Sequence, residues 1–339
     1  MKIAIVSPRA NPEASGGAER FYEALGAAFR QAGHAATELV VPADERDFDA
    51  IKRNYLACYD LDVSDFDFVV STKAPTWLVR HPRHVCYLVH TIRVFYDMFE
   101  STFPDPTPEL LAQRQLIHQL DSAALSPPRC KAVFSIGFEV SRRLSEWNHL
   151  SAEVLHPPLW NSGFHTGPSS NYLLMPGRLH EWKRVDLAIR AMKHVKAPLR
   201  LVITGTGEAE AELRSLAADD PRIEFRGRVT DEDLVALYAG ALAVPFLPLR
   251  EDYGYVTLEA FASGKPVVTC TDSGEAAAIV ATSNGGYVVP PEPSAVAAIL
   301  DRLCDNPELA CSMGGHGSDW VAQLSWGKVV ERLISAAGD

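Results

Sequence analysis

The sequence predicts an α/β protein whose chain folds as two doubly wound halves, and three observations indicate this class. Short apolar runs typical of buried strands alternate with longer stretches of helical periodicity along the whole chain. The alternation stops at 157–171, where the chain is rich in Pro, Gly, Ser and His, and then begins again. A length of 339 residues with 47% hydrophobic residues is enough for two cores, each in a domain of about 150 residues.

The composition excludes several classes of protein. A formal net charge of -11 argues against a general nucleic-acid-binding protein, whose surface would be basic. The six cysteines form no CxxC pair, so the sequence indicates neither a zinc site nor a disulfide framework. The start of the chain lacks a signal-peptide pattern, and no apolar run reaches the roughly 20 residues of a membrane span. We therefore expect a cytoplasmic protein, in which any membrane contact is peripheral and made by the N-terminal half.

The first half alternates six predicted strands with three predicted helices. The strands are expected at 2–7, 37–41, 66–71, 84–91, 132–135 and 152–155, and the helices at 18–33, 108–124 and 138–147. Gly16 and Gly17 precede the first helix, and their lack of a Cβ atom lets the backbone approach a ligand, although a flexible turn is an equal interpretation. This loop is not a GxGxxG motif, so the dinucleotide fingerprint is absent.

Two polar features flank the predicted strand 84–91. The cluster before it has two interpretations, a solvated loop or a contact with an anionic acceptor or an acidic membrane surface. Its members are Arg80, His81, Arg83 and His84. His90 lies at the end of the strand, and the carboxyl end of a strand in a doubly wound domain is where ligands bind. His90 is therefore a candidate site residue, although histidines are more often structural.

The second half repeats the alternation. Its strands are expected at 172–175, 199–204, 223–226, 242–247, 267–271 and 287–289. Its helices are expected at about 184–195, 231–239, 256–262, 295–303 and 326–337. A further, charged helix is expected to follow the GTGE sequence at 205–208.

Arg178 and Lys183 lie in the connection between the predicted strand 172–175 and the helix that follows. Two surface charges on a loop are the simpler interpretation. A guanidinium and an ammonium group at the carboxyl end of a strand also suit a diphosphate, the arginine as a planar fork and the lysine as a point charge. We therefore predict an anion site in this connection.

The segment 248–264 predicts a strand-to-helix turn with carboxylates at both ends. Free N–H groups and the helix macrodipole near Gly254 would attract a phosphate. Glu251 and Glu259 bracket this helix start, and carboxylates beside a phosphate are better explained as acceptors for hydroxyl groups. A ligand with both phosphates and hydroxyls is a nucleotide sugar. An ordinary acidic loop before an amphipathic helix is the alternative.

These motifs resemble those of the retaining glycosyltransferases of family 4, the glycosyl transferases group 1. The shared features are Glu251–x7–Glu259 around an aromatic–glycine step, GGAER at 16–20, GRL at 177–179 with Lys183 after it, and HPP at 156–158. The resemblance covers essentially the whole chain and implies the GT-B architecture, two Rossmann-like doubly wound domains facing a central crevice. It implies an acceptor-side domain at 1–160, a nucleotide-sugar-binding domain at 161–325, and a helix at 326–339 that crosses back toward the first domain.

The resemblance further implies that a hexose moves from a nucleotide sugar to an acceptor hydroxyl with retention of anomeric configuration. It gives catalytic roles to His90, Glu251, Arg178 and Lys183: the two cations would hold the departing diphosphate, Glu251 the sugar hydroxyls and His90 the far edge of the sugar. Glu259 would hold the ribose. The donor-binding set that it implies is Gly16, Gly17, Arg178, Lys183, Arg228, Val229, Glu251, Tyr253, Gly254, Tyr255, Val256 and Glu259.

One part of the chain departs from the family pattern. After 271–274 the family usually has a second glycine and, a few residues later, a glutamate, whereas this chain has Glu275 and Ala278 there. No DxD pair occurs where Mg²⁺ would be expected, so we predict no metal ion and no cofactor. The donor is expected to be GDP- or UDP-linked and the acceptor a glycan, a lipid-linked or a small molecule. The alternatives are a catalytically weakened nucleotide-sugar-binding subunit, or an epimerase or phosphorylase of the same fold.

Overall fold

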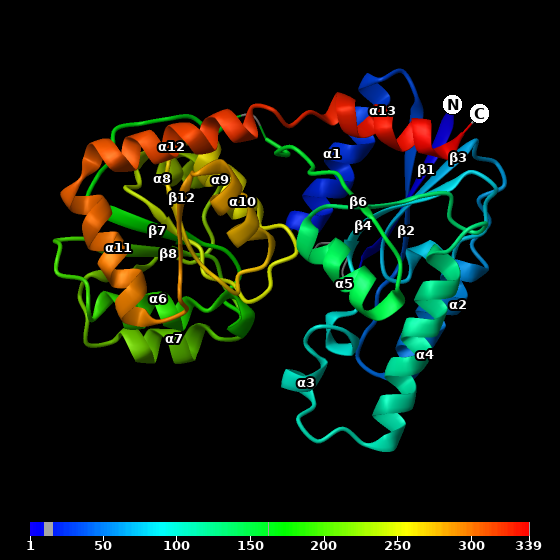
Figure 1. Ribbon diagram of the computed structural model, residues 1–339, viewed down its shortest axis with the longest axis horizontal. Coiled ribbons are helices and arrows are strands. Elements are labelled where there is room, and N and C mark those ends of the chain that lie inside the picture. The colour runs from blue at the N-terminus through cyan, green and yellow to red at the C-terminus, as the bar shows by residue number, and fades with distance from the viewer. Residues whose placement is uncertain (10–15, 162, 339) are drawn as a thin grey trace. The chain divides into compact units, whose positions relative to one another are not determined.

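The computed structural model describes residues 1–9, 16–161 and 163–338 (Figure 1). Its contacts divide the chain into two compact units. The N-terminal unit consists of Met1–Trp160 together with Ser325–Asp339, and the C-terminal unit is Asn161–Leu324. Residues 10–15, between the first predicted strand and Gly16, lie outside the described residues.

The N-terminal unit is built on a parallel sheet with the strand order β2-β1-β3-β4-β5-β6 in its described part. The strands are β1 (Lys2–Arg9), β2 (Ala35–Pro42), β3 (Phe68–Lys73), β4 (His84–His90), β5 (Val133–Ser135) and β6 (Glu153–Val154). The order reverses between β1 and β3, and an open α/β sheet binds ligands outside the carboxyl ends of its strands at such a reversal.

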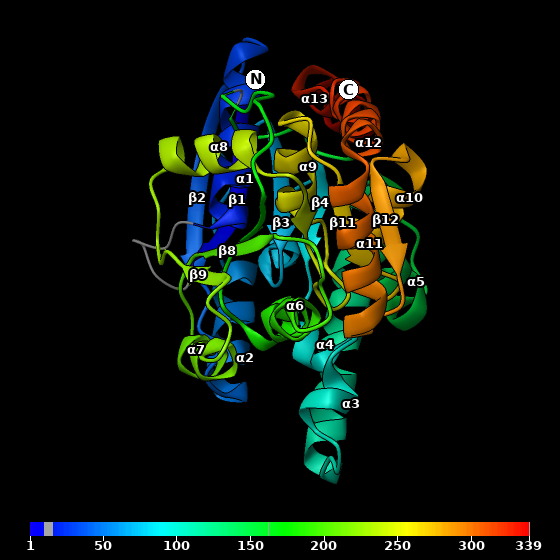
Figure 2. The ribbon, with the colours of Figure 1, turned by 90° about the vertical axis from the view of Figure 1, so that its left-hand side faces the viewer.

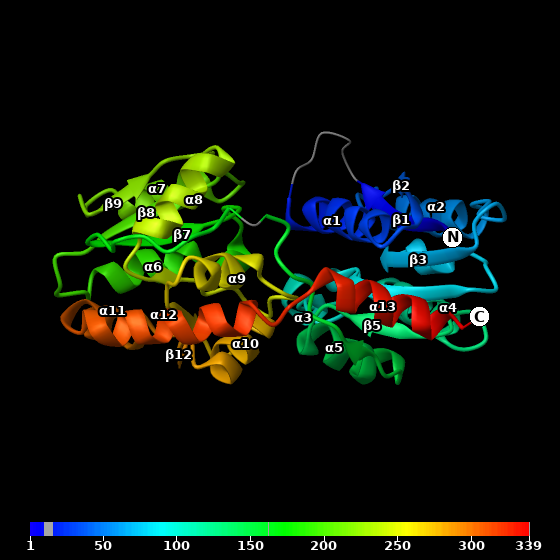
Figure 3. The same ribbon diagram turned by 90° about the horizontal axis from the view of Figure 1, so that it is seen from above.

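Helices cover the sheet of the N-terminal unit. They are α1 (Gly17–Gln31), α2 (Phe48–Tyr59), the short α3 (Phe99–Thr102), α4 (Pro108–Leu125), α5 (Phe138–Asn148) and α13 (Trp326–Ala337). Figures 1 and 3 show α13 next to α1 and β4, and the rings of Phe21 and Trp326 lie 6.0 Å apart. The C-terminal helix therefore buries its apolar face, including Val329 and Leu333, against elements from the beginning of the chain.

A buried carboxylate sits inside the N-terminal unit. Asp121 of α4 is fully buried and accepts hydrogen bonds from the Tyr55 hydroxyl at 2.7 Å, the Trp77 indole at 2.9 Å and the Tyr96 hydroxyl at 2.6 Å. Burial raises the pKa of Asp121 to about 6, although the three donors favour its charged form. This network joins α2, the turn after β3 and the segment after β4 to α4.

The C-terminal unit contains two three-stranded parallel ladders, β7-β8-β9 and β10-β11-β12. Their strands are β7 (Tyr172–Pro176), β8 (Arg200–Thr204), β9 (Ile223–Phe225), β10 (Val244–Pro245), β11 (Val267–Cys270) and β12 (Gly286–Val289). A bridge between Leu173 and Ala243 joins the ladders, so the order reverses between β7 and β10. The predicted strand at 242–247 is shorter than expected because Pro245 has no N–H to donate.

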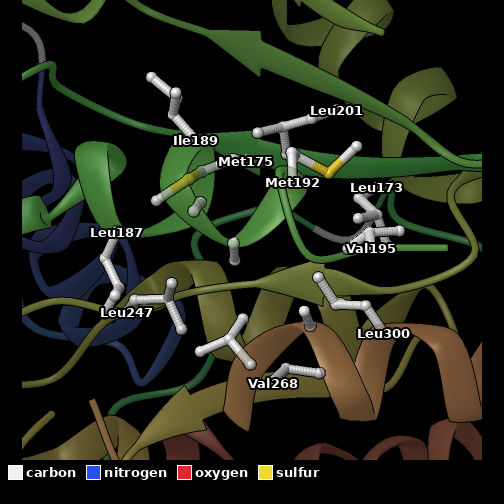
Figure 4. Packing of buried hydrophobic residues seen from close by; sticks show 14 of the residues in the cluster. Leu173, Met175, Leu187, Ile189, Met192, Val195, Leu201, Leu247, Val268 and Leu300 are labelled. Atoms are coloured by element: carbon white, nitrogen blue, oxygen red, sulfur yellow. The ribbon is translucent and has the colours of Figure 1, made fainter. Parts of the chain in front are cut away.

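Helices lie on both faces of these strands. They are α6 (Val185–Met192), α7 (Glu210–Ala217), α8 (Asp231–Gly240), α9 (Tyr255–Ala262), α10 (Glu275–Ser283), α11 (Pro293–Asp305) and α12 (Pro307–Val321). Figures 1 and 2 show α8 and α9 on one side of β7 and β8, and α6 and α7 on the other. In the core on the α6 side, Met175 and Leu201 of the strands meet Ile189 and Met192 of α6 and Leu300 of α11 (Figure 4).

Four helices of the described structure, α2, the short α3, α10 and α12, were not predicted from the sequence. Helix α12 includes Gly314, Gly315 and Gly317, which lower its helix propensity. A Cβ atom at Gly314 would lie 1.9 Å from the Gly264 carbonyl oxygen, and one at Gly317 would lie 2.4 Å from the Phe261 ring. These glycines therefore allow α12 to pack closely on α9. Across the described residues, the structure contains no helix both long and apolar enough to traverse a bilayer.

Candidate active site

Three loops of the C-terminal unit meet at the carboxyl ends of β7, β10 and β11. Backbone hydrogen bonds join them, because the Leu249 amide donates to the Trp182 carbonyl at 2.7 Å and the Arg250 amide to the Asp272 carbonyl at 2.9 Å. The Glu251 amide adds a bond to the Ser273 carbonyl at 3.2 Å. The parallel topology thus places the predicted anion site and the predicted hydroxyl-binding carboxylate at one edge of the sheet.

Lys183 and Glu251 form an ion pair across two of these loops. The Nζ atom of Lys183 lies 2.6 Å from Oε2 of Glu251 and 5.7 Å from the centre of the Phe246 ring. The lysine side chain is 32% exposed and the glutamate side chain 17% exposed, so both can still be reached from solvent. An ammonium group held in this way can exchange its carboxylate for a phosphate.

Arg178 lies in a different pair. Its Nη2 is 3.1 Å from Oε2 of Glu208, in the loop after β8, and the Nε2 of His180 is 3.3 Å from the other oxygen of the same carboxylate. Both partners of the arginine pair are more than half exposed. A Cβ atom at Gly205 would lie 1.9 Å from the Gly177 carbonyl oxygen, so a glycine is required for these two loops to pack. The structure therefore places Arg178 near the predicted edge but outside the Lys183–Glu251 pair.

The start of α9 has no side-chain cap. Gly254 precedes the helix with φ of 81°, and it supplies no side-chain acceptor for the first amides. A Cβ atom there would lie 2.6 Å from the Phe246 ring. Tyr253 is buried with its ring 5.1 Å from that of Tyr255, whereas Val256 is half-buried. The Tyr255 hydroxyl is buried, and its pKa is raised by that burial.

Glu259 lies on the buried side of α9. It is 6% exposed, and its Oε2 accepts a 2.7 Å hydrogen bond from the Tyr238 hydroxyl of α8. Burial raises the pKa of Tyr238 well above its ordinary value, so this hydroxyl stays a donor at neutral pH. Glu259 is thus held in a fixed orientation and is less exposed than Glu251, whose side chain is 17% exposed.

The loop after β9 carries Arg228 and Val229, the residues predicted to face a base. Gly227 has φ of 65° and its carbonyl accepts from the Gly205 amide at 2.7 Å, which ties this loop to the one after β8. Arg228 is exposed, Val229 is half-buried, and Thr230 caps α8 by accepting from the Asp233 amide. The backbone between β9 and α8 is therefore fixed at both ends.

The departure at Glu275 has a structural consequence. Glu275 is the first residue of α10 and is fully buried, and its amide donates to the Glu251 carbonyl at 2.9 Å. Gly274 forms a bridge with Glu251, and a Cβ atom at Gly274 would lie 2.6 Å from the Glu251 carbonyl oxygen. Ala278 follows one helical turn later and is half-buried. The buried carboxylate of Glu275 thus begins a helix that is bonded directly to the Glu251 backbone.

Sequence reasoning did not select Arg184, the residue after Lys183. Its guanidinium donates to the Leu247 and Pro248 carbonyls and forms a two-pronged pair with Asp272. An arginine directly after a candidate anion-binding lysine is a weak signal by itself. Its long-range partners are visible only in the folded chain.

The N-terminal unit holds the remaining predicted residues. His90 ends β4, is half-buried, and accepts from the Ala74 amide through its carbonyl at 3.2 Å. Gly16 and Gly17 are exposed at the start of α1, where the Gly16 amide donates to the Glu19 carboxylate at 2.9 Å. An anion that approached this amide would have to compete with Glu19.

The basic cluster before β4 lies at the opposite, amino end of that strand. Arg80 donates to the Tyr59 carbonyl and Arg83 to the Gly338 carbonyl. His84 is buried against Ser71, and burial lowers its pKa to about 4. These contacts favour a bracing role within the unit. In the described part of the chain, no group of three or more His, Cys, Asp or Glu residues is arranged to hold a metal ion.

Comparison with solved structures identifies the class of fold. Sucrose-phosphate synthase from Thermosynechococcus elongatus is similar with a TM-score of 0.77 and 18% identity, over 99% of each chain. HepE from Anabaena, solved with UDP-glucose, is similar with a TM-score of 0.72 and 15% identity, over 99% of this chain and 98% of that one. The fold is GT-B, an α/β architecture with two Rossmann-like domains, which confirms the predicted fold class.

The sequence comparisons place part of the chain. Residues 170–306 match the family model described as glycosyl transferases group 1. A D-inositol 3-phosphate glycosyltransferase of Corynebacterium kroppenstedtii is 31% identical over 170 residues. That match covers 46% of this chain but only 38% of the relative.

Proposed function

We propose that this protein transfers a hexose from a nucleoside-diphosphate sugar to an acceptor hydroxyl, with retention of anomeric configuration and without a metal ion. The main support is the Lys183–Glu251 pair at the sheet edge where ligands of open α/β sheets bind, within the region that matches the family. One cation and one carboxylate in contact provide recognition for both halves of such a donor.

The proposed chemistry follows from the contacts around this pair. When the donor binds, its diphosphate takes the place of the Glu251 carboxylate at Lys183. The released carboxylate then accepts hydrogen bonds from the sugar hydroxyls. Arg178 and the first amides of α9 add positive potential where the departing diphosphate gains charge. No proton transfer by the protein is needed for this step, because the leaving phosphate can take the acceptor proton.

The remaining residues are assigned to recognition. Glu259, held by Tyr238, accepts from the ribose, and the backbone at Arg228 and Val229 faces the base. His90 keeps the role on the transferred sugar that the family resemblance gives it. A buried, oriented carboxylate such as Glu259 suits a vicinal diol, because its geometry is fixed before the ligand arrives.

Two of the comparisons suggest where to begin the search for substrates. UDP-glucose is the first donor to test because HepE was solved with it, and GDP-sugars follow. The name of the Corynebacterium relative makes a phosphorylated polyol the first small-molecule acceptor, beside glycans and lipid-linked acceptors. These choices set the order of the experiments.

The proposal is tested by measuring thermal stability with UDP-, GDP-, TDP- and ADP-sugars, and then donor turnover with and without acceptors. A donor at about 100 times its dissociation constant should add about 2.7 kcal/mol to the stability of the unit that binds it. Stabilisation followed by transfer with retention is the expected result. Stabilisation without turnover would instead indicate a binding subunit, and a failure of every nucleotide sugar to stabilise the protein would refute the proposal.

A further inference from the structure

We propose that Arg184 is a positioning residue. By joining the three loops of the site, it keeps the side chains of Lys183 and Glu251 in contact. The inference rests on the proposed function, because it concerns two residues assigned to the donor. It adds a residue that touches neither the diphosphate nor the sugar in that assignment.

The side chain of Arg184 connects its own loop to the other two. From the loop after β7, its Nε donates to the Leu247 carbonyl at 2.6 Å and its Nη2 to the Pro248 carbonyl at 3.0 Å, both in the loop after β10. Its Nη1 and Nη2 lie 2.8 Å and 2.7 Å from the two oxygens of Asp272, in the loop after β11. Only a planar guanidinium can make this set of bonds with one side chain.

The backbone of Arg184 is unusual for a residue with a side chain. Its φ is 49°, in the left-handed region, where glycine is the residue that avoids strain. Arg250, which directly precedes Glu251, has φ of 48°. Left-handed residues other than glycine persist where the surroundings fix them strongly. At Arg184 the four carbonyl and carboxylate contacts are the interactions that offset the strain.

The contacts of Arg184 determine where the reactive side chains lie. Lys183 is its neighbour in the chain, so a shift of the Arg184 backbone moves the ammonium group directly. Glu251 follows the anchored Pro248 by three residues, and its amide and that of Arg250 donate to the segment that carries Asp272. Without the guanidinium, the loops would lose the side chain that bonds to Leu247, Pro248 and Asp272, and they would depend more on the backbone bonds at 249–251.

Arg222 provides a matched control. Its guanidinium also donates to two carbonyls, those of Val195 and Met192, and pairs with one aspartate, Asp220. It lies just before β9, at the amino end of that strand, and therefore at the edge of the sheet away from the site. Removing Arg222 tests what the loss of such a bonded arginine does to the fold alone.

The experiment compares R184G with R222A in the full chain. Glycine accepts the left-handed backbone, so R184G removes the guanidinium without adding strain. In R184G the amides of Leu249, Arg250 and Glu251 should exchange with deuterium roughly tenfold faster or more. Binding of UDP or GDP should weaken and kcat should fall on the order of 100-fold, as expected when reacting groups are misplaced by about 1 Å. R222A should leave these amides, the binding and kcat within about twofold of the wild type.

The outcomes separate this inference from the proposed function. Unchanged exchange at 249–251 in R184G would overturn it, and so would faster exchange with unchanged binding and turnover. If R184G does not fold, D272N removes the charged partner of Arg184 and should show the same pattern more weakly. If the wild type binds none of UDP, GDP, TDP and ADP, the proposed function fails, whereas the exchange data still decide whether Arg184 holds the loops.

Discussion

The ammonium group of Lys183 lies 2.6 Å from the carboxylate of Glu251, although 68 residues separate them in the chain. Sequence reasoning gave these residues separate tasks, one on the diphosphate and one on the sugar. In the folded chain each neutralises the other, so a bound diphosphate has to compete with Glu251 for the lysine. Their affinities for ligand are therefore coupled, and the first two predictions depend on this coupling.

Replacing Glu251 should separate binding from turnover. In E251Q the lysine loses its charged competitor, so the affinity for the nucleoside diphosphate should be unchanged or higher. Turnover should fall, because the lost contact is to the sugar as charge develops on it. Calorimetric titration of UDP or GDP beside steady-state rates would measure both. E181Q removes an exposed charge from the turn that carries Lys183 and serves as the control. Weaker nucleotide binding in E251Q alone would contradict the exchange of partners at Lys183.

Removing the two cations should weaken nucleotide binding by different amounts. K183A should cost about 1.5–3 kcal/mol of binding free energy, as for other charge-assisted hydrogen bonds. R178A should cost less, because Arg178 is 68% exposed against 32% for Lys183 and water screens its charge more. Dissociation constants for the diphosphate would test this order. R190A, which removes an exposed arginine of α6, should leave them unchanged. Equal constants in all three variants would exclude a diphosphate clamp here.

Variants of Glu259 and Tyr238 should distinguish ribose binding from support of the fold. E259Q should weaken both the nucleoside diphosphate and the full donor, because the ribose is common to them. Y238F removes only the hydroxyl that donates to Glu259 at 2.7 Å, and it should change binding less than E259Q does. Titration of both ligands into both variants measures the difference. If Y238F weakens binding as much as E259Q, Glu259 acts through its bond to Tyr238 and not on the ribose.

Local pattern was enough to predict the strands and the location of the candidate site. Apolar runs indicated the parallel strands, and the connections after β7 and β10 were selected because their charged residues follow strand ends. Helix α12 was missed because its glycines reduce helix propensity, while the close approach to Gly264 and Phe261 that requires them is a long-range contact. Local sequence cannot report such a contact.

The partners within the site could not be predicted for the same reason. Spacing along the chain indicated that Glu251 and Glu259 flank a helix start, but not that one pairs with Lys183 and the other with Tyr238. The left-handed backbone of Arg184 gave no signal either, because arginine has no preference for that conformation. These features arise when three distant loops are brought to one sheet edge.

Turnover should survive an excess of EDTA. The charge on the departing diphosphate is proposed to be met by Lys183, Arg178 and the amides at the start of α9, which take the place that a divalent ion has in other transferases. Rates measured with EDTA, and again after addition of Mg²⁺ or Mn²⁺, would test this expectation. Loss of activity with EDTA that either ion restores would show that the protein side chains are insufficient.

The buried Asp121 should make the stability of the N-terminal unit depend on pH. Its pKa is about 6 in the folded chain, against an ordinary value of 3.8. The folded state therefore keeps a proton that the unfolded chain releases at lower pH. The stability that this proton contributes is complete below pH 4 and is lost as the pH rises through about 6. A difference of about two pKa units corresponds to about 3 kcal/mol.

The prediction is that D121N flattens this part of the pH profile. Urea unfolding of the wild type and D121N, followed by tryptophan fluorescence between pH 4 and pH 8, would measure it. Trp77 reports locally, because its indole donates to Asp121 at 2.9 Å. The free energy of unfolding of the wild type should fall relative to D121N by up to about 3 kcal/mol between pH 4 and pH 7. D65N, at an exposed aspartate of the same unit, should keep the wild-type profile. Parallel profiles for the wild type and D121N would show that Asp121 is already ionised in the folded state at pH 4.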